Sequence, residues 1–233
     1  MNIGSNTNCE KIVDVIIEDI MHGKLLKGEK LPTERRMAED MGVSRASVRE
    51  ALKSMESMGI TMSIQGSGTY ITSTPEMAIN RPLCALFALS QGTIENVMQL
   101  RIVLETAACW DIIETASDER IKAVCELCRY DYINLPVAEQ TVLDARFHES
   151  LVKMSNNSLV KYLYITLSSL MDVYREKVLE ETYKLDENKI TREGHYAICD
   201  ALTARDTIGV GLAIKEHLEL TGEYREALVN NVQ

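Results

Sequence analysis

The chain has 233 residues and a formal net charge of −10, and 45% of its residues are hydrophobic but only 5% aromatic. A core of aliphatic and Met side chains with few aromatic rings favours packed helices over a β-sandwich. The negative charge argues against a protein that coats nucleic acid indiscriminately. The first residues are polar, unlike a signal peptide, and no apolar run approaches the ~20 residues that span a bilayer. We therefore expect a cytoplasmic protein with no membrane partner.

The charge is unevenly distributed along the chain. Residues 1–75 carry 9 Lys and Arg against 10 Asp and Glu, whereas the remaining residues carry 16 against 25. A surface that binds DNA must then be a local basic cluster, with the acidic surface elsewhere.

A helix-turn-helix is predicted near the N-terminus. Apolar residues recur with helical spacing, and the predicted helices cover residues 10–21, 34–41 and 45–58. Gly42 ends the second helix and Ser44 can cap the third, so only a tight turn separates them. Two short helices joined in this way form a helix-turn-helix.

A β-hairpin is predicted directly after the third helix. Alternating residues at 61–64 and 69–72 flank a glycine-rich turn at 65–68, which is typical of a hairpin. A hairpin in this place is a wing. We therefore expect a winged helix-turn-helix DNA-binding domain over residues 1–74, followed by a polar linker at 73–80.

The remaining chain has helical periodicity throughout. Residues 79–233 are expected to form an all-α antiparallel helical bundle, so the fold as a whole is mainly α. The predicted helices cover residues 79–90, 93–116, 118–134, 138–155, 158–181, 186–204 and 206–229.

The six cysteines are expected to be reduced core residues. Cys125 and Cys128 form a lone C-x-x-C. A zinc ribbon needs a second such pair, and the sequence has none. We interpret the motif as two thiols on one face of a helix.

The start of the third helix carries the residues expected to contact DNA. Arg45 and Arg49 are four residues apart and share a helix face, and arginine can bind guanine or a phosphate. An isolated pair would indicate only a solvated surface, but this pair follows the turn and precedes the wing. The expected DNA contacts are Arg35, Arg36, Ser44, Arg45, Ser47, Arg49, Gly66 and Ser67.

These motifs resemble the winged helix of the GntR family. The similarity covers about residues 9–72 and is carried by residues 28–35, 43–45, 48–52 and 66–69. It implies operator contacts by the residues that match Arg35, Arg45, Arg49 and Gly66. Lys27 stands where proline is common in the family, but it lies in a loop and does not bear on these contacts.

Three of the four histidines lie in the predicted helical domain, whereas His22 is expected at the surface. Asp144 precedes His148 by four residues, so the two side chains share a helix face. His195 and His217 lie on two later predicted helices. Three imidazoles and a carboxylate can bind a transition metal, although a histidine on an apolar helix face is more often a core residue.

The helical region resembles the FCD domain, the ligand-binding domain of the FadR subfamily. The similar elements are 101–105 (R-x-x-L-E), 144–148 (D-x-x-F-H), 193–195 with 201–202 and Asp206, and Ala213 with His217. The resemblance spans most of residues 79–222. It implies a divalent metal held by Asp144, His148, His195 and His217, with zinc expected first and nickel or manganese as alternatives. Some members of the subfamily lack these ligands and bind acyl-CoA instead.

An octahedral ion with four protein ligands leaves two positions for water or an organic acid, whereas a structural zinc would be closed. Arg101 is the candidate clamp for such an acid; a buried partner of Glu105 or a surface arginine are the other interpretations. We expect a homodimeric repressor or activator that binds an inverted repeat in double-stranded DNA under control of a small organic acid. A metal-dependent helical enzyme, for which no general-base motif stands out, and a regulator with a purely structural metal are the alternatives.

Overall fold

A computed structural model describes residues 7–74, 80–129, 135–168, 170–171 and 189–229 of the chain. The chain divides into two compact units, Met1–Arg81 and Pro82–Gln233, each with buried apolar clusters of its own. Across the described ranges, no helix combines the length and the apolar character that a bilayer span requires. The fold is mainly α-helical with an antiparallel two-stranded hairpin, as the sequence predicts.

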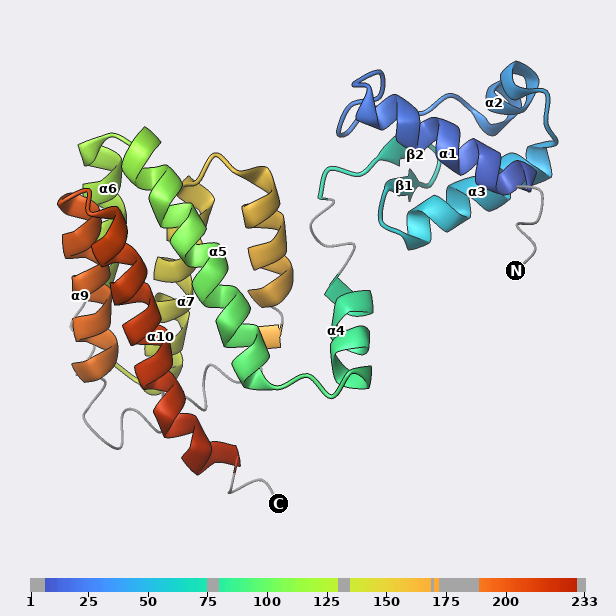
Figure 1. The fold of residues 1–233 in the computed structure, drawn as a ribbon. Coiled ribbons are helices and arrows are strands. Elements are labelled where there is room, and N and C mark those ends of the chain that lie inside the picture. The colour runs from blue at the N-terminus through green and yellow to red at the C-terminus, as the bar shows by residue number, and fades with distance from the viewer. Residues whose placement is uncertain (1–6, 75–79, 130–134, 169, 172–188, 230–233) are drawn as a thin grey trace. The chain divides into compact units, whose positions relative to one another are not determined.

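The first unit places a hairpin after a helix-turn-helix (Figure 1). Its elements are α1 (Asn8–Met21), α2 (Glu34–Met41), α3 (Arg45–Ser57), β1 (Thr61–Ile64) and β2 (Gly68–Ile71). The strands pair antiparallel, with Thr61 opposite Ile71 and Ile64 opposite Gly68. The predicted helix-turn-helix and wing are confirmed, with bounds that differ by one or two residues.

Two helix caps and one glycine produce the tight turn between α2 and α3. The Thr33 side chain accepts a hydrogen bond from the Arg36 N–H at 3.3 Å, and Ser44 accepts one from the Ser47 N–H at 3.0 Å. Gly42 ends α2 in the left-handed region, with φ 64° and ψ 33°. Glycine adopts this conformation without the steric penalty of a Cβ atom.

One face of α3 is buried, so the side chains on its opposite face point to solvent. Val48 and Met55 of α3 are fully buried, as is Ile12 of α1. Arg45 and Arg49 lie on the opposite side of α3 and are exposed. The apolar pattern of the helix therefore determines which residues face solvent.

The second unit is a helical bundle (Figure 1). It contains all but the first two residues of α4 (Asn80–Leu89). The elements that follow are α5 (Ile94–Thr115), α6 (Asp118–Cys125), the 3₁₀ helix η2 (Glu126–Cys128), α7 (Val137–Met154), helical residues 158–168 and 170–171, α9 (Lys189–Thr203) and α10 (Thr207–Val229). Helix α10 packs against α9 and α5, and α5 also packs against α7. Apolar side chains of α5, α6, α7, α9 and α10 form the core.

The helix predicted at 118–134 is shorter than expected. It ends at Cys125 and a 3₁₀ turn continues to Cys128, while residues 130–134 lie outside the described ranges. The apolar pattern cannot reveal this break, because residues three apart share a face in both kinds of helix. The two cysteines are buried, as expected, but they lie on two successive helices. The predicted helical residues 172–181 and 186–188 also fall outside the described part.

The core of the second unit contains charged side chains. Arg101, Glu105, Asp144 and His148 are buried beside apolar residues such as Phe147. Burying a charge is costly unless it is paired or bound to an ion. These side chains therefore mark the part of the bundle where function is to be sought.

Candidate metal centre and nucleic-acid interface

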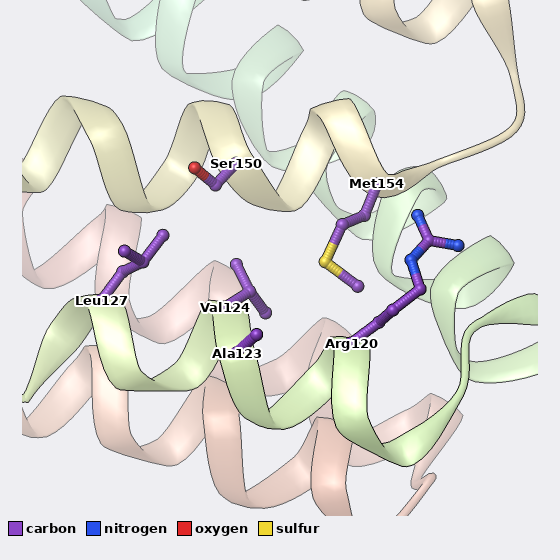
Figure 2. Close-up of a pocket in the computed structure, with 6 residues that line it drawn as sticks. All are labelled: Arg120, Ala123, Val124, Leu127, Ser150 and Met154. Atoms are coloured by element: carbon purple, nitrogen blue, oxygen red, sulfur yellow. The ribbon is translucent and has the colours of Figure 1, made fainter.

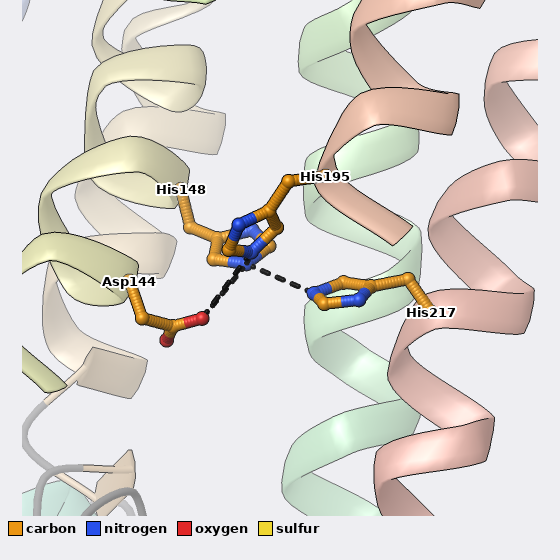
Figure 3. A group of neighbouring side chains, drawn as sticks. All are labelled: Asp144, His148, His195 and His217. Carbon is orange, nitrogen blue, oxygen red and sulfur yellow. Dashed lines mark hydrogen bonds and ion pairs between the residues drawn. The ribbon is translucent and has the colours of Figure 1, made fainter. Parts of the chain in front are cut away.

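Three helices bring four ligand-type side chains to one point inside the second unit (Figure 3). Asp144 and His148 lie one turn apart on α7, His195 is on α9 and His217 is on α10. All four are buried, and each offers one oxygen or nitrogen atom within 4.8 Å of the others. The structure thus brings together the four residues that the sequence analysis selected.

The distances between these four atoms fit their binding to one shared metal ion. His148 Nε2 lies 3.1 Å from His195 Nε2 and 3.2 Å from His217 Nε2. Asp144 Oδ1 lies 3.3 Å from His195 Nε2 and 3.6 Å from His148 Nε2. Two ligand atoms that each lie about 2.0–2.2 Å from one ion are separated by about 2.8–3.6 Å at octahedral or tetrahedral angles. Nitrogen lone pairs this close repel unless a proton or a cation lies between them, so the donor set fits a divalent transition metal.

A carboxylate behind His148 fixes the orientation of its ring. His148 Nδ1 lies 2.8 Å from Glu105 Oε2, and both side chains are fully buried. An N–H at Nδ1 that donates to this carboxylate leaves the Nε2 lone pair directed at the centre. This contact was not predicted from sequence, where Glu105 was considered only as a partner of Arg101. The D-x-x-F-H and R-x-x-L-E elements lie 43 residues apart, and nothing local links them.

Arg101 is a buried partner of Glu105, one of the three interpretations that the sequence left open. The Arg101 side chain donates from Nε to Glu105 Oε1 at 2.6 Å, and the residue is only 5% exposed. Its Nη2 atom is buried and has no hydrogen-bond partner among the described residues. Thr191 lies one turn before His195 on α9, and its Oγ1 atom is also buried without a hydrogen-bond partner among the described residues. Thr191 was not among the site residues predicted from sequence.

The electrostatics of the centre favour, for most of the four ligands, the protonation state that binds a cation. Burial alone would raise the pKa of Asp144, but the imidazoles of His148 and His195 hold it well below its usual range. Burial lowers the pKa of His195, and burial with the two other imidazoles lowers the pKa of His217 further. At His148 the effect of burial is outweighed by Glu105 and Asp144, which raise its pKa. An ionised carboxylate and neutral imidazoles are the forms that bind metals.

Gly194 allows α9 and α10 to approach closely at the centre. A Cβ atom at this position would lie 2.3 Å from His217 Nδ1 and 3.0 Å from His217 Cβ. Real Cβ atoms do not come that close to other atoms, so His217 occupies space that only a glycine leaves. Gly194 lies in a stretch that resembles FCD domains, but no role was predicted for it from sequence.

A separate cavity of about 290 Å³ lies between α6 and α7 (Figure 2). Its lining is mostly apolar, with Arg120 and Ser150 as the polar members. None of the four ligand residues lines it, and we therefore do not assign it to the metal centre. The residues that line the cavity are Arg120, Ala123, Val124, Leu127, Ser150 and Met154.

The residues expected to contact DNA lie at the exposed start of α3 and on α2. Arg45 is exposed and makes no ion pair with any described residue. Arg49 Nη2 lies 3.2 Å from Glu34 Oε2, a pair 15 residues apart that the sequence analysis did not anticipate. This contact holds the Arg49 guanidinium across the turn. Of the two arginines, Arg45 can therefore contact DNA without breaking an ion pair, whereas Arg49 cannot.

The other expected contacts have roles within the unit as well. Arg35 and Arg36 each pair with an acid one turn later on α2, at 3.8 and 2.9 Å. The hydroxyls of Ser44 and Ser47 hydrogen-bond each other at 2.9 Å. Since all four residues lie at or near the surface, these contacts leave them accessible to a phosphate.

The turn of the wing combines a glycine in open space with a hydrogen bond between two side chains. Gly66 has φ 75°, and a Cβ there would meet no atom within 4 Å. The hydroxyls of Ser67 and Tyr70 lie 2.5 Å apart. A nucleic-acid backbone can therefore approach Gly66 without a steric obstacle from this unit.

Both units match known protein families. The profile described as "Bacterial regulatory proteins, gntR family" matches residues 8–71, and that of the FCD domain matches residues 96–220. The chain is 26% identical to the HTH-type transcriptional regulator YcbG of Bacillus subtilis (strain 168), over 93% of this chain and 89% of that protein. It is 28% identical to the HTH-type transcriptional regulator LutR of the same organism, over 85% of this chain and 92% of that protein.

A solved structure shows the same fold. The Streptococcus agalactiae GntR structure matches with a TM-score of 0.66 and 23% identity, over 92% of this chain and 99% of that chain. The FCD match alone covers more than half of the sequence, and the other match covers the helix-turn-helix and the wing. The chain therefore belongs to the GntR family of bacterial regulatory proteins, in the group that carries an FCD domain after the winged helix.

Proposed function

We propose that this transcriptional regulator binds an operator through α3 and the wing, and that a small carboxylate bound at a metal ion controls its affinity for DNA. One observation carries the proposal: four convergent ligand atoms form a buried centre in a chain that also has an exposed helix-turn-helix. A buried cluster of this kind is costly to maintain without an ion. The family supplies the role of regulator, and the cluster suggests how that role is controlled.

The proposed ion is a divalent transition metal held by the four ligands Asp144, His148, His195 and His217. Imidazole and carboxylate ligands suit zinc, nickel and manganese, and we take zinc first. Four protein ligands leave two positions of an octahedral ion for the oxygens of an organic acid. The ion would supply positive charge and directional bonds that a purely organic pocket lacks.

Two buried polar atoms support a carboxylate as the ligand. Arg101 Nη2 and Thr191 Oγ1 have no hydrogen-bond partner in the described part of the chain. Arginine binds a carboxylate through charge-assisted hydrogen bonds. A hydroxy-, keto- or dicarboxylic acid could bind the metal with one end and receive hydrogen bonds from these atoms at the other.

We also propose that the regulator acts as a homodimer on an inverted repeat. Helices α5 and α10 pack together, and Trp110 Nε1 donates to Thr207 O at 2.8 Å between them. Large apolar residues are exposed along both helices, which suits contact with a second copy of the chain. These residues are Leu100, Val103, Trp110, Ile208 and Leu212.

Replacing Arg45 by Ala should weaken operator binding by about 1–3 kcal/mol if Arg45 contacts a base. Arg49→Ala should have an equal or smaller effect, because Arg49 must first give up part of its ion pair with Glu34. Fluorescence anisotropy at fixed salt measures both. Lys153→Ala, which removes an exposed charge from α7, should leave affinity unchanged. Wild-type affinity in both arginine variants would contradict the assignment of α3.

A carboxylate effector should change operator affinity by roughly 5–150-fold, the usual range of coupling between two sites. A ligand shifts the equilibrium between two conformations of a protein only if it binds one of them more tightly. An acid bound to the ion would interact with α7, α9 and α10 at once, because these three helices carry the metal ligands. The measurement is an anisotropy titration of metal-loaded protein with a panel of hydroxy-, keto- and dicarboxylic acids.

Two variants identify the receptor of the acid. His195→Ala removes a metal ligand, whereas Thr191→Val removes one hydroxyl and keeps the shape of the side chain. Both should reduce the response to the acid. An acid that acts equally on wild-type protein and on His195→Ala does not bind through the metal, and the proposed mechanism would be wrong.

A further inference from the structure

Three buried thiols meet in the second unit, outside the set of metal ligands. Cys128 Sγ lies 3.5 Å from Cys199 Sγ, although the residues are 71 positions apart. Cys125 Sγ donates to the Cys199 carbonyl at 3.9 Å, and Cys128 Sγ donates to the Cys125 carbonyl at 3.0 Å. All three cysteines are free. The contact between η2 and α9 is thus made partly by sulfur atoms.

We propose that Cys128 and Cys199 are a redox-active pair, which a peroxide converts into a disulfide bond between η2 and α9. Their sulfur atoms need to approach from 3.5 Å to about 2.05 Å. The C-x-x-C pair itself is the less favourable choice, because the Cys128 thiol is directed at the Cys125 carbonyl and at the Cys199 sulfur. Disulfides in proteins of reducing compartments are usually transient and redox-sensing.

The surroundings of the thiols assign their roles. A hydrogen bond from Cys199 lowers the pKa of Cys128 and outweighs the effect of burial. Hydrogen bonds with Cys125 and Cys128 raise the pKa of Cys199. A hydrogen bond with Cys199 also lowers the pKa of Cys125, so the pKa shifts do not distinguish Cys125 from Cys128. The distance does, because it is Cys128 Sγ that lies 3.5 Å from Cys199 Sγ. Cys128 is therefore the thiolate that reacts first, since the thiolate is the nucleophile, and Cys199 is the thiol that resolves the product.

The chemistry balances with one molecule of hydrogen peroxide. The Cys128 thiolate attacks a peroxide oxygen, the O–O bond breaks, and Cys128 sulfenic acid and hydroxide form. The hydroxide takes the proton of Cys199, giving water. The Cys199 thiolate then attacks the Cys128 sulfur, and the hydroxide that leaves takes up a proton to give a second water. The two thiols together lose two electrons, and the peroxide gains them.

Peptide mapping of the full-length protein tests the pair without any substitution. Trypsin cleaves after Lys and Arg, so Cys125 and Cys128 fall in residues 123–129 and Cys199 falls in residues 193–205. Folded protein is treated with hydrogen peroxide and then denatured in the presence of a thiol-blocking reagent. It is next digested with trypsin and analysed by mass spectrometry without reduction. The expected result is a loss of two free thiols per chain and a cross-link between the two peptides, assigned by fragmentation to Cys128.

Other outcomes of the mapping overturn the proposal. An internal disulfide within residues 123–129, a Cys125–Cys199 cross-link, or full blocking of all thiols after peroxide treatment would each do so. Cys125→Ser should retain the cross-link, whereas Cys128→Ser should lose it. Cys84→Ser, which removes a thiol from α4, is the matched control and should retain it.

The disulfide should also affect the metal centre, a consequence that rests on the proposed function. Cys199 lies one turn after His195 on α9, and metal–ligand distances in proteins stay within about 0.2 Å of their standard values. Oxidised protein should bind zinc about 10-fold or more weakly than reduced protein, the scale of losing an outer contact of a ligand. Chelator competition measures this. A disulfide with unchanged zinc affinity overturns the coupling alone, whereas no zinc binding in the reduced form rejects the metal centre and leaves the thiol pair standing.

Discussion

Replacing His148 by Ala should abolish stoichiometric metal binding and lower the melting temperature of the metal-loaded protein. The ion would join α7, α9 and α10, so its binding free energy adds to the stability of the folded state. With free metal at about a thousand times its dissociation constant, that contribution is about 4 kcal/mol. For a unit of this size the loss corresponds to a decrease of roughly 10 °C. Elemental analysis and thermal unfolding are the measurements.

Two controls separate metal binding from packing. His22→Ala should change neither quantity, because His22 is exposed and its Nδ1 lies 2.7 Å from the Glu18 carbonyl oxygen in the first unit. With a chelator present, the wild-type protein should lose the metal-dependent part of its advantage over His148→Ala. If wild-type protein contains no metal after reconstitution with zinc, nickel or manganese, the centre is not a metal site.

The fold of the first unit is predictable from sequence because its signals are local. Thr33, Gly42 and Ser44 define the ends of α2 and α3 within twelve positions, and each acts through hydrogen bonds to near neighbours or through its own φ. The hairpin is equally local, with a glycine at each side of its turn. The end of α6 at Cys125 was not predictable, because the apolar pattern continues through η2.

The metal centre is only partly visible in the sequence. Spacing places Asp144 and His148 on one face of α7, but a helical pattern cannot show that α9 and α10 direct His195 and His217 to the same point. That expectation came from resemblance to the FCD domain. The remaining contacts join residues far apart in the chain, as in the pair of His148 with Glu105. Such contacts depend on how the helices pack, which local periodicity does not determine.

Gly194 shows how packing can reverse a local expectation. In the interior of an α-helix, Ala is about 1 kcal/mol more favourable than Gly, so the local sequence of α9 predicts that Gly194→Ala stabilises the protein. The structure predicts the opposite. The new Cβ would lie 2.3 Å from His217 Nδ1 and 3.0 Å from its Cβ atom, so rotation of the ring alone cannot relieve the contact.

Gly194→Ala should therefore destabilise the protein by about 1–3 kcal/mol through overpacking, and it should displace His217 enough to weaken metal binding although all four ligands remain. Thermal unfolding with and without metal, together with elemental analysis, measures both effects. Gly211→Ala is the matched control on α10, because its Cβ would meet Thr106 Cγ2 at an ordinary 3.5 Å. It should keep full metal content and unchanged or slightly higher stability. If Gly194→Ala behaves in the same way, the close approach of α9 to His217 does not shape the centre.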